Sequence, residues 1–132
     1  MKRKATIIKT SIDGKRQIAI DEKNQSILKT YFSQDKRHIK KFTDICGIIL
    51  DGLRNNELYK KENINKKCKG VMAMRFFRGQ ENDRIYCKEI HLDNKVLTVI
   101  CAELLEKKKN QKNKQREKNL IKKVAGYEYE IR

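Results

Sequence analysis

Two short β-rich runs open the chain. The runs at residues 5–10 and 16–20 are rich in isoleucine, and Asp13-Gly14 stands between them. An Asp-Gly pair between two such runs is typical of a β-hairpin turn. The pattern therefore predicts an N-terminal strand or hairpin within residues 1–20.

Apolar residues recur at helical intervals after Asp21, which is a plausible N-cap. The first helical stripe consists of Ile27, Leu28, Tyr31 and Phe32. A longer stripe predicts a second helix at about residues 35–53, and its members are Ile39, Phe42, Ile45, Cys46, Ile49 and Leu53. Residues 57–63 are expected to add a helical turn. The helical region as a whole is therefore placed at residues 21–63.

Three strand-like runs follow in the second half of the chain. They cover about residues 71–77, 84–92 and 95–105, and polar turns separate them. The third run is almost continuously apolar, which is typical of a central strand covered on both faces. We therefore expect a three-strand antiparallel meander within residues 69–105.

A basic segment and a final helix complete the predicted order. Residues 107–116 are densely basic, and the apolar positions of the helix are Leu120, Ile121, Val124 and Ala125, with Gly126 at its end. This places a basic segment and a C-terminal helix at residues 107–132. The order of elements predicts a single α+β domain over residues 1–132, with two helices packed on a small antiparallel sheet.

The charge balance points to a polyanionic partner. The 132 residues contain 33 Lys and Arg against 17 Asp and Glu, a formal net charge of +16. Each Lys or Arg that neutralises a phosphate releases counterions, which favours binding to nucleic acid. The sequence shows no signal peptide, no lipidation motif and no apolar stretch of about 20 residues. These features favour nucleic acid over a membrane as the partner, and a cytoplasmic location.

Metal and cofactor chemistry is not indicated. The sequence has no P-loop, G-x-S-x-G or H-E-x-x-H motif, and its carboxylates are scattered among lysines. The four cysteines form no C-x-x-C pair, so we interpret them as small buried thiols. His38 is expected on the solvent-exposed face of the second helix and His91 at a strand end, which makes both poor candidates for acid–base catalysis. We therefore expect no metal and no cofactor.

A cationic, tyrosine-bearing face of the meander remains as the candidate site. Strand alternation places Arg84, Tyr86 and Lys88 on one face, and the basic segment follows the third strand. Such a face suits RNA cleavage without a metal, in which a base removes the 2′-hydroxyl proton, arginine clamps the phosphate and tyrosine stacks on a base. The candidate residues are Arg75, Arg84, Tyr86, Lys88, Lys107, Lys108, Lys109 and Lys112. The residues alone favour phosphate binding without catalysis.

The order of three motifs resembles the HigB branch of the RelE/ParE toxin superfamily. Members of that branch typically show a "K-G-…-E-L-R" strand, an "R-I-x-Y" strand, and an apolar strand that ends in "K-K-T-Q-K-T-P" before a helix. The matching stretches here are Lys69-Gly70-Val71-Met72-Ala73-Met74-Arg75-Phe76, then Asp83-Arg84-Ile85-Tyr86, then Leu104-Leu105-Glu106-Lys107-Lys108-Lys109-Asn110-Gln111-Lys112. The resemblance covers about residues 66–128. Because each motif is short, the specificity of the resemblance comes from the order and spacing of the motifs.

The resemblance implies a ribosome-dependent endoribonuclease that cuts mRNA and is held inactive by a cognate antitoxin, an acidic or helix-turn-helix protein. It also implies two helices on a small antiparallel sheet. By matching position, Arg84, Lys108, Lys109 and Lys112 become the catalytic candidates. The RNA-binding candidates are Arg75, Tyr86, Lys88, Lys107 and Gln111.

The chain departs from the family pattern at three places. Glu106 stands where the motif is usually apolar, Asn113 stands where the family has proline, and the N-terminal β element is longer than usual. Two alternatives stay open beside the interferase hypothesis. One is a ParE-like topoisomerase poison, against which the lysines of residues 107–112 argue, and the other is an RNA- or DNA-binding protein without catalysis.

Overall fold

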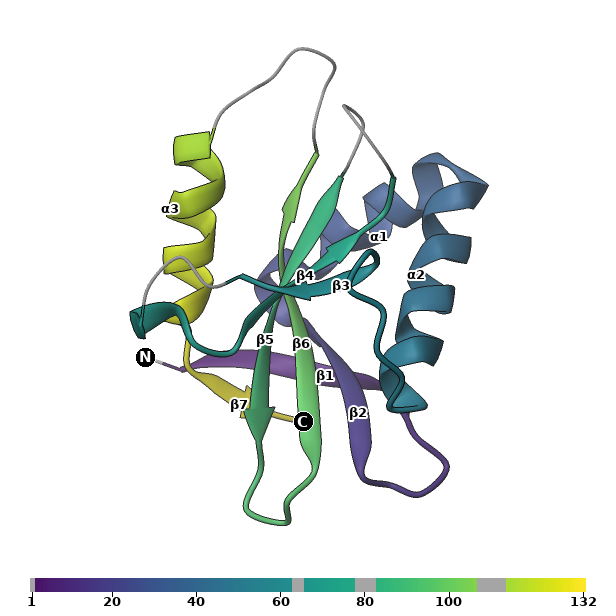
Figure 1. Cartoon of the computed structure of the whole chain (residues 1–132), viewed down its shortest axis with the longest axis vertical. Helices are drawn as coiled ribbons and strands as arrows, with labels where there is room; N and C mark the ends of the chain where they lie inside the picture. Colours follow the sequence, from purple (N-terminus) through teal and green to yellow (C-terminus); the bar gives the residue numbers. More distant parts are fainter. Residues whose placement is uncertain (1, 63–65, 78–82, 107–113) are drawn as a thin grey trace.

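A curved β-sheet lies between helices on its two faces (Figure 1). The computed structural model describes residues 2–62, 66–77, 83–106 and 114–132. Helices α1 (Gln25–Gln34) and α2 (Lys36–Leu50) cover one face of the sheet, and α3 (Lys114–Ala125) covers the other. Each face therefore has its own hydrophobic core.

The sheet is mixed and curls into half a barrel. In the described part of the chain it has seven strands, in the order β3-β4-β5-β6-β2-β1-β7. Their bounds are β1 Arg3–Thr10, β2 Arg16–Asp21, β3 Tyr59–Lys61, β4 Val71–Arg75, β5 Arg84–His91, β6 Leu97–Leu105 and β7 Tyr129–Ile131. Neighbouring strands are antiparallel, except that β2 runs parallel to β6 and β1 runs parallel to β7.

The predicted fold, two helices packed on a small antiparallel sheet of three strands, is wrong, and so is the same fold implied by the family resemblance. The meander strands β4, β5 and β6 are present, but the sheet continues past β6 into β2. A parallel ladder joins them from Arg16–Leu97 to Ile20–Cys101. Residues 57–63, expected as a helical turn, contain the edge strand β3 instead, and β7 adds a strand after α3. The pairings of β2 with β6 and of β1 with β7 join segments that are far apart in the sequence, so a local sequence pattern does not predict them.

Aspartates cap two helical segments on the first face, the 3-10 turn before α1 and the helix α2. The carboxylate of Asp21 accepts hydrogen bonds from the backbone N–H groups of Lys23 and Asn24, in a 3-10 turn that leads into α1. Asp35 is extended and accepts a hydrogen bond from the N–H group of Arg37, so it caps α2 in the same way. The residue predicted to cap the first helix therefore caps this 3-10 turn, whereas α1 itself follows Asn24, whose side chain makes no capping hydrogen bond.

The buried face of α2 differs from the predicted stripe. Its buried residues are His38, Phe42, Ile45, Cys46 and Ile49. Ile39 and Leu53, which the stripe included, are 45% and 63% exposed. The helix ends at Leu50, and Gly52 has a φ of 72°, the left-handed conformation that favours glycine after a helix. The predicted stripe therefore began at Ile39 instead of the buried His38, and it continued about one turn past the end of the helix.

The two cores fix the helices against the sheet. Phe42 and Ile45 of α2 pack with buried residues of β2, β4, β5 and β6, while Ile121 and Val124 of α3 pack against Tyr86 on the opposite face. Burying a side chain of this size contributes roughly 1.5–3 kcal/mol. None of the described helices combines the length and the apolar composition that a membrane crossing requires.

Candidate nucleic-acid interface

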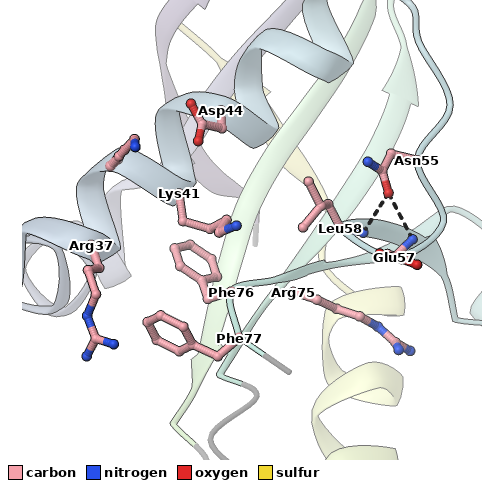
Figure 2. Close-up of a pocket in the computed structure, with 10 residues that line it drawn as sticks. Arg37, Lys41, Asp44, Asn55, Glu57, Leu58, Arg75, Phe76 and Phe77 are labelled. Carbon is pink, nitrogen blue, oxygen red and sulfur yellow. Dashed lines mark hydrogen bonds between the residues drawn. The ribbon is translucent and has the colours of Figure 1, made fainter. Parts of the chain in front are cut away.

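Two arginines meet at one end of the sheet, on the face that α3 covers. Arg75 is the last residue of β4 and Arg84 is the first of β5, and their Cα atoms are direct partners in the antiparallel ladder. Because side chains alternate along a strand, Arg75 shares the face of buried Ala73, and Arg84 shares the face of Tyr86. Figure 2 shows the Arg75 side chain turned away from Phe77. The sequence prediction that Arg84 and Tyr86 share a face is therefore confirmed.

Each arginine faces a glutamate from a different element. Nη2 of Arg75 lies 3.6 Å from Oε1 of Glu62, next to β3, and Nη1 of Arg84 lies 3.9 Å from Oε2 of Glu117 on α3. The four side chains are between 14% and 24% exposed. Both distances exceed that of an ordinary N–H···O bond, and the Nε atoms of both arginines are buried without a hydrogen-bond partner among the described residues. Each guanidinium therefore keeps a buried donor without a hydrogen-bond partner, which a ligand would reach only after the contact with the glutamate opens.

The hydroxyl of Tyr86 belongs to the same cluster. The Tyr86 side chain is fully buried, with its hydroxyl beside the Arg84 side chain. Burial raises the pKa of Tyr86 to about 12, although the positive charge of Arg84 opposes this shift. The phenol is therefore neutral at physiological pH and can donate its proton to a hydrogen bond. Because α3 covers the ring, the base stacking expected for Tyr86 is not available in this arrangement.

Lys88 is used by the fold. Its Nζ donates hydrogen bonds to the carbonyl oxygens of Ala125, at 2.9 Å, and of Tyr127. These carbonyls lie at the end of α3, where a cation is favourable. Burial lowers the pKa of Lys88, and the nearby Glu128 opposes that shift. In this arrangement Lys88 holds α3 to the sheet rather than facing a phosphate.

Five of the predicted site residues lie outside the described residues, namely Lys107, Lys108, Lys109, Gln111 and Lys112. What the structure does describe is where their segment starts. The Cα atom of Leu105, the last residue of β6, is the ladder partner of Arg84. The chain thus leaves the sheet beside the arginine pair.

A second cationic surface lies against α2 (Figure 2). A cavity of about 800 Å³ opens between α2, the segment before β3 and the end of β4. Its cationic lining residues are Arg37, Lys40, Lys41 and Arg75, and Phe76 and Phe77 form its aromatic part. We call this cavity the α2 groove. The sequence interpretation missed the α2 groove. The basic residues of α2 indicate only a solvent-exposed helix face, and Phe77 was predicted as part of a strand.

The site can also be compared with proteins that are already known. No protein-family model, no curated protein and no solved structure matches the chain. Its function therefore has to be argued from the chemistry of its own residues. Among the described residues, no three His, Cys, Asp or Glu side chains converge as a metal site would require.

The prediction that His38 lies on the solvent-exposed face of α2 is wrong. It is only 8% exposed, and its ring stacks on Tyr31 with the ring centroids 3.9 Å apart. Its Nδ1 lies 2.7 Å from the carbonyl oxygen of Tyr31, within hydrogen-bond distance. His38 therefore joins α1 to α2 as a core residue.

The four cysteines are buried and free, as expected for small core thiols. Burial raises the pKa of the Cys46 thiol, and a hydrogen bond with Cys87 raises that of Cys101. Both effects disfavour the thiolate, which is the reactive form. His91 is exposed at the end of β5, as predicted for a strand-end residue.

Proposed function

We propose that the protein is a metal-independent endoribonuclease that cuts mRNA, and that it serves as the toxin of a type II toxin–antitoxin pair. The observation that carries the proposal is the arginine pair Arg75–Arg84, whose ion pairs with glutamates are long and whose buried Nε atoms have no hydrogen-bond partner among the described residues. Two guanidinium groups can stabilise the charge of a pentacovalent phosphate when no metal takes part.

The proposed reaction uses the 2′-hydroxyl of the RNA as the nucleophile. A base removes its proton, the 2′-oxygen bonds to the adjacent phosphorus, and the bond from phosphorus to the 5′-oxygen breaks as that oxygen gains a proton. The products are a 2′,3′-cyclic phosphate and a 5′-hydroxyl end. The resemblance assigns the proton transfers to the basic segment with Lys108, Lys109 and Lys112. Ribosome dependence and an antitoxin partner rest on the same resemblance, and a cytoplasmic location rests on the sequence features given above.

The glutamates would keep the arginines in place until RNA binds. Glu62 and Glu117 contact them at 3.6 and 3.9 Å, longer than the roughly 2.7–2.9 Å of a charge-assisted hydrogen bond. A phosphate that approached the guanidinium groups could form such bonds in the bidentate geometry that arginine favours. Phosphate would then replace the two glutamates and form shorter hydrogen bonds with the guanidinium groups. This possibility supports a phosphate site at the arginine pair.

A second candidate function is nucleic-acid binding without catalysis. The same two ion pairs favour it, because arginines neutralised by glutamates under a helix also occur as purely structural contacts. In that case the Arg84–Glu117 pair would hold α3 on the sheet, the Arg75–Glu62 pair would join β4 to the residue after β3, and the net charge of +16 alone would attract the polyanion.

The deciding experiment is cleavage of mRNA on programmed ribosomes, with the ends of the products identified. We expect the native protein to give 5′-hydroxyl ends, and Arg84→Ala to lose at least about 100-fold in rate, since removing one such donor commonly costs that much. Lys95→Asn is a matched control, because it removes a positive charge from the opposite end of β5 at a position with a φ of 66° that asparagine tolerates. An intact message with folded native protein, or equal cleavage by Arg84→Ala, would reject the proposal.

A further inference from the structure

The α2 groove has a lining that neither the proposed reaction nor the fold requires. Lys40 is exposed and Lys41 half-buried on α2, and among the described residues neither forms an ion pair. Figure 2 shows the Lys41 side chain reaching from α2 across the groove above Phe76. Both lysines line the groove, so an anionic ligand there would be attracted by two positive charges that have no described ion-pair partner.

An aromatic ring adjoins these lysines. Phe77 is half-buried, and the guanidinium carbon of Arg37 lies 5.1 Å from its ring centroid. Phe76 beneath it is only 1% exposed and packs edge-on against Tyr31, which fixes the floor of the groove. The exposed Arg37 side chain also donates hydrogen bonds to both carboxylate oxygens of Asp35. A ring and a guanidinium plane of this kind are surfaces on which nucleic-acid bases stack.

We propose that the α2 groove binds single-stranded RNA, with a base stacked at Phe77 and the backbone phosphates held by Lys40 and Lys41. The inference rests on the proposed function in one respect, namely that the bound strand would be the substrate of the arginine pair. Arg75 supports the connection, because its stem lines the groove while its guanidinium faces Glu62. The groove would thus be a substrate-positioning site beside the reacting phosphate.

Charge complementarity favours RNA over an acidic protein segment. The groove also contains the carboxylates of Asp44 and Glu57. They would repel the phosphates of RNA as well as acidic side chains, but a base amino group can donate a hydrogen bond to them, and the side chain of an ionised Asp or Glu cannot. The carbonyl oxygen of Asn55 is used in the turn before β3, where it accepts from the N–H groups of Glu57 and Leu58, so its amide nitrogen is a donor that a base can meet (Figure 2).

The test is fluorescence anisotropy of the full chain with a labelled RNA of about twelve nucleotides, within the usual range of such sites. Its 2′-hydroxyls are methylated so that the probe cannot be cleaved. Phe77→Leu should weaken binding roughly tenfold and leave the salt dependence unchanged. Lys40→Ala with Lys41→Ala should reduce the slope of log affinity against log salt by about 1.4, because each phosphate contact on a single strand contributes about 0.7.

The controls separate the groove from the rest of the charge. Lys29→Ala with Lys95→Asn removes two exposed cations outside the groove. It lowers the net charge by the same amount as the Lys40/Lys41 variant and should leave the affinity within about twofold of the native value. Phe77→Trp should restore or strengthen binding, because tryptophan also stacks, and it guards against a Phe77→Leu protein that merely unfolds. Native-like affinity in both Phe77→Leu and the Lys40/Lys41 variant would overturn the inference. Tighter binding of a labelled oligoglutamate than of RNA would overturn it in favour of an acidic protein partner.

The two proposals fail separately. Cleavage that depends on Arg84, together with groove variants that bind normally, would leave the reaction standing and reject the groove. Binding that depends on Phe77 and the two lysines, with no cleavage by native protein, would keep the groove and reject the nuclease.

Discussion

Replacing Asp21 is expected to weaken the fold more than any surface change of similar size. Its carboxylate is fully buried. Oδ2 accepts from Nε of Arg3 at 2.6 Å and from the hydroxyl of Tyr129 at 2.7 Å, while Oδ1 accepts from the N–H groups of Lys23 and Asn24. One side chain therefore connects β1, β2, β7 and the turn into α1.

The magnitude follows from these partners. Asp21→Asn keeps the shape but removes the negative charge opposite Arg3, whose side chain is only 16% exposed. Breaking a buried ion pair costs about 3–5 kcal/mol, and we take about 3 because the Arg3 guanidinium also lies 3.9 Å above the Tyr127 ring. Asp21→Ala also removes the helix cap, which adds about 1 kcal/mol. We therefore expect losses of about 3 kcal/mol for the asparagine variant and about 4 kcal/mol for the alanine variant.

Urea unfolding followed by circular dichroism measures this loss. With a urea dependence of roughly 1–3 kcal/mol per molar, Asp21→Asn should lower the midpoint by about 1–3 M. Asp51→Asn, at an exposed position after α2, should stay within about 0.5 kcal/mol of the native protein. In a double-mutant cycle, adding Arg3→Met should cost much less in the Asp21→Asn background than in the native one. A loss below about 1 kcal/mol for Asp21→Asn, or full additivity in the cycle, would refute the assigned role.

Three further predictions follow from burial. Burial raises the pKa of all five tyrosines, to about 12 for Tyr86 and Tyr127, so the stability they contribute is fully present below about pH 10 and is lost as the pH rises further. Tyrosinate absorbance should therefore appear together with alkaline unfolding, and free phenol titration near pH 10 in folded protein would contradict this. Lys88→Met should cost about 1–3 kcal/mol in urea unfolding, because it leaves the carbonyls at the end of α3 without their donor, while the salt slope of RNA binding stays unchanged. A slope reduced by about 0.7 would instead assign Lys88 to a phosphate. The four buried cysteines should react with a thiol reagent only on unfolding, and rapid labelling of the folded protein would contradict their burial.

Local patterns predicted the elements whose signal lies within the element. The hairpin of β1 and β2 turns near Asp13-Gly14, where Gly14 has a φ of 74°, and α3 ends just before Gly126. The central place of β6 followed from its apolar run, since cores cover it on both faces. These features depend on turn chemistry and periodicity, both of which can be judged over a few residues.

The pairing of distant strands could not be predicted in this way. Arg16 and Leu97 are ladder partners, yet nothing near either residue indicates the other. The strands β3 and β7 are three residues long, too short for an alternation to be recognised. The three-strand sheet failed for this reason, because the missing strands are defined by their partners and not by their own sequences.

The candidate site shows the same division. Alternation along β5 correctly put Arg84, Tyr86 and Lys88 on one face, but it could not say that α3 covers that face. Tyr86, which was expected to contact RNA on an open sheet, is buried under α3, and Lys88 donates hydrogen bonds to carbonyl groups at the end of that helix. His38 shows the converse error, because its lysine neighbours suggested solvent while its ring stacks on Tyr31.

The end of β4 is where the two proposed sites join. Alternation turns Arg75 toward the face of α3 and Phe76 toward the core under α1 and α2, and Phe77 then lines the groove. The Cα atoms of Arg75 and Phe77 are at most about 7 Å apart along an extended chain, close to the rise of two stacked nucleotides. A strand with one base at Phe77 would therefore have to pass over the end of β4 to bring its next phosphate to the Arg75 guanidinium, which lies on the α3 face. On this geometry, changes at Phe77 or Lys41 should act on substrate affinity, whereas changes at Arg84 should act on the rate of the bound complex, because only the arginine pair meets the charge that develops during cleavage.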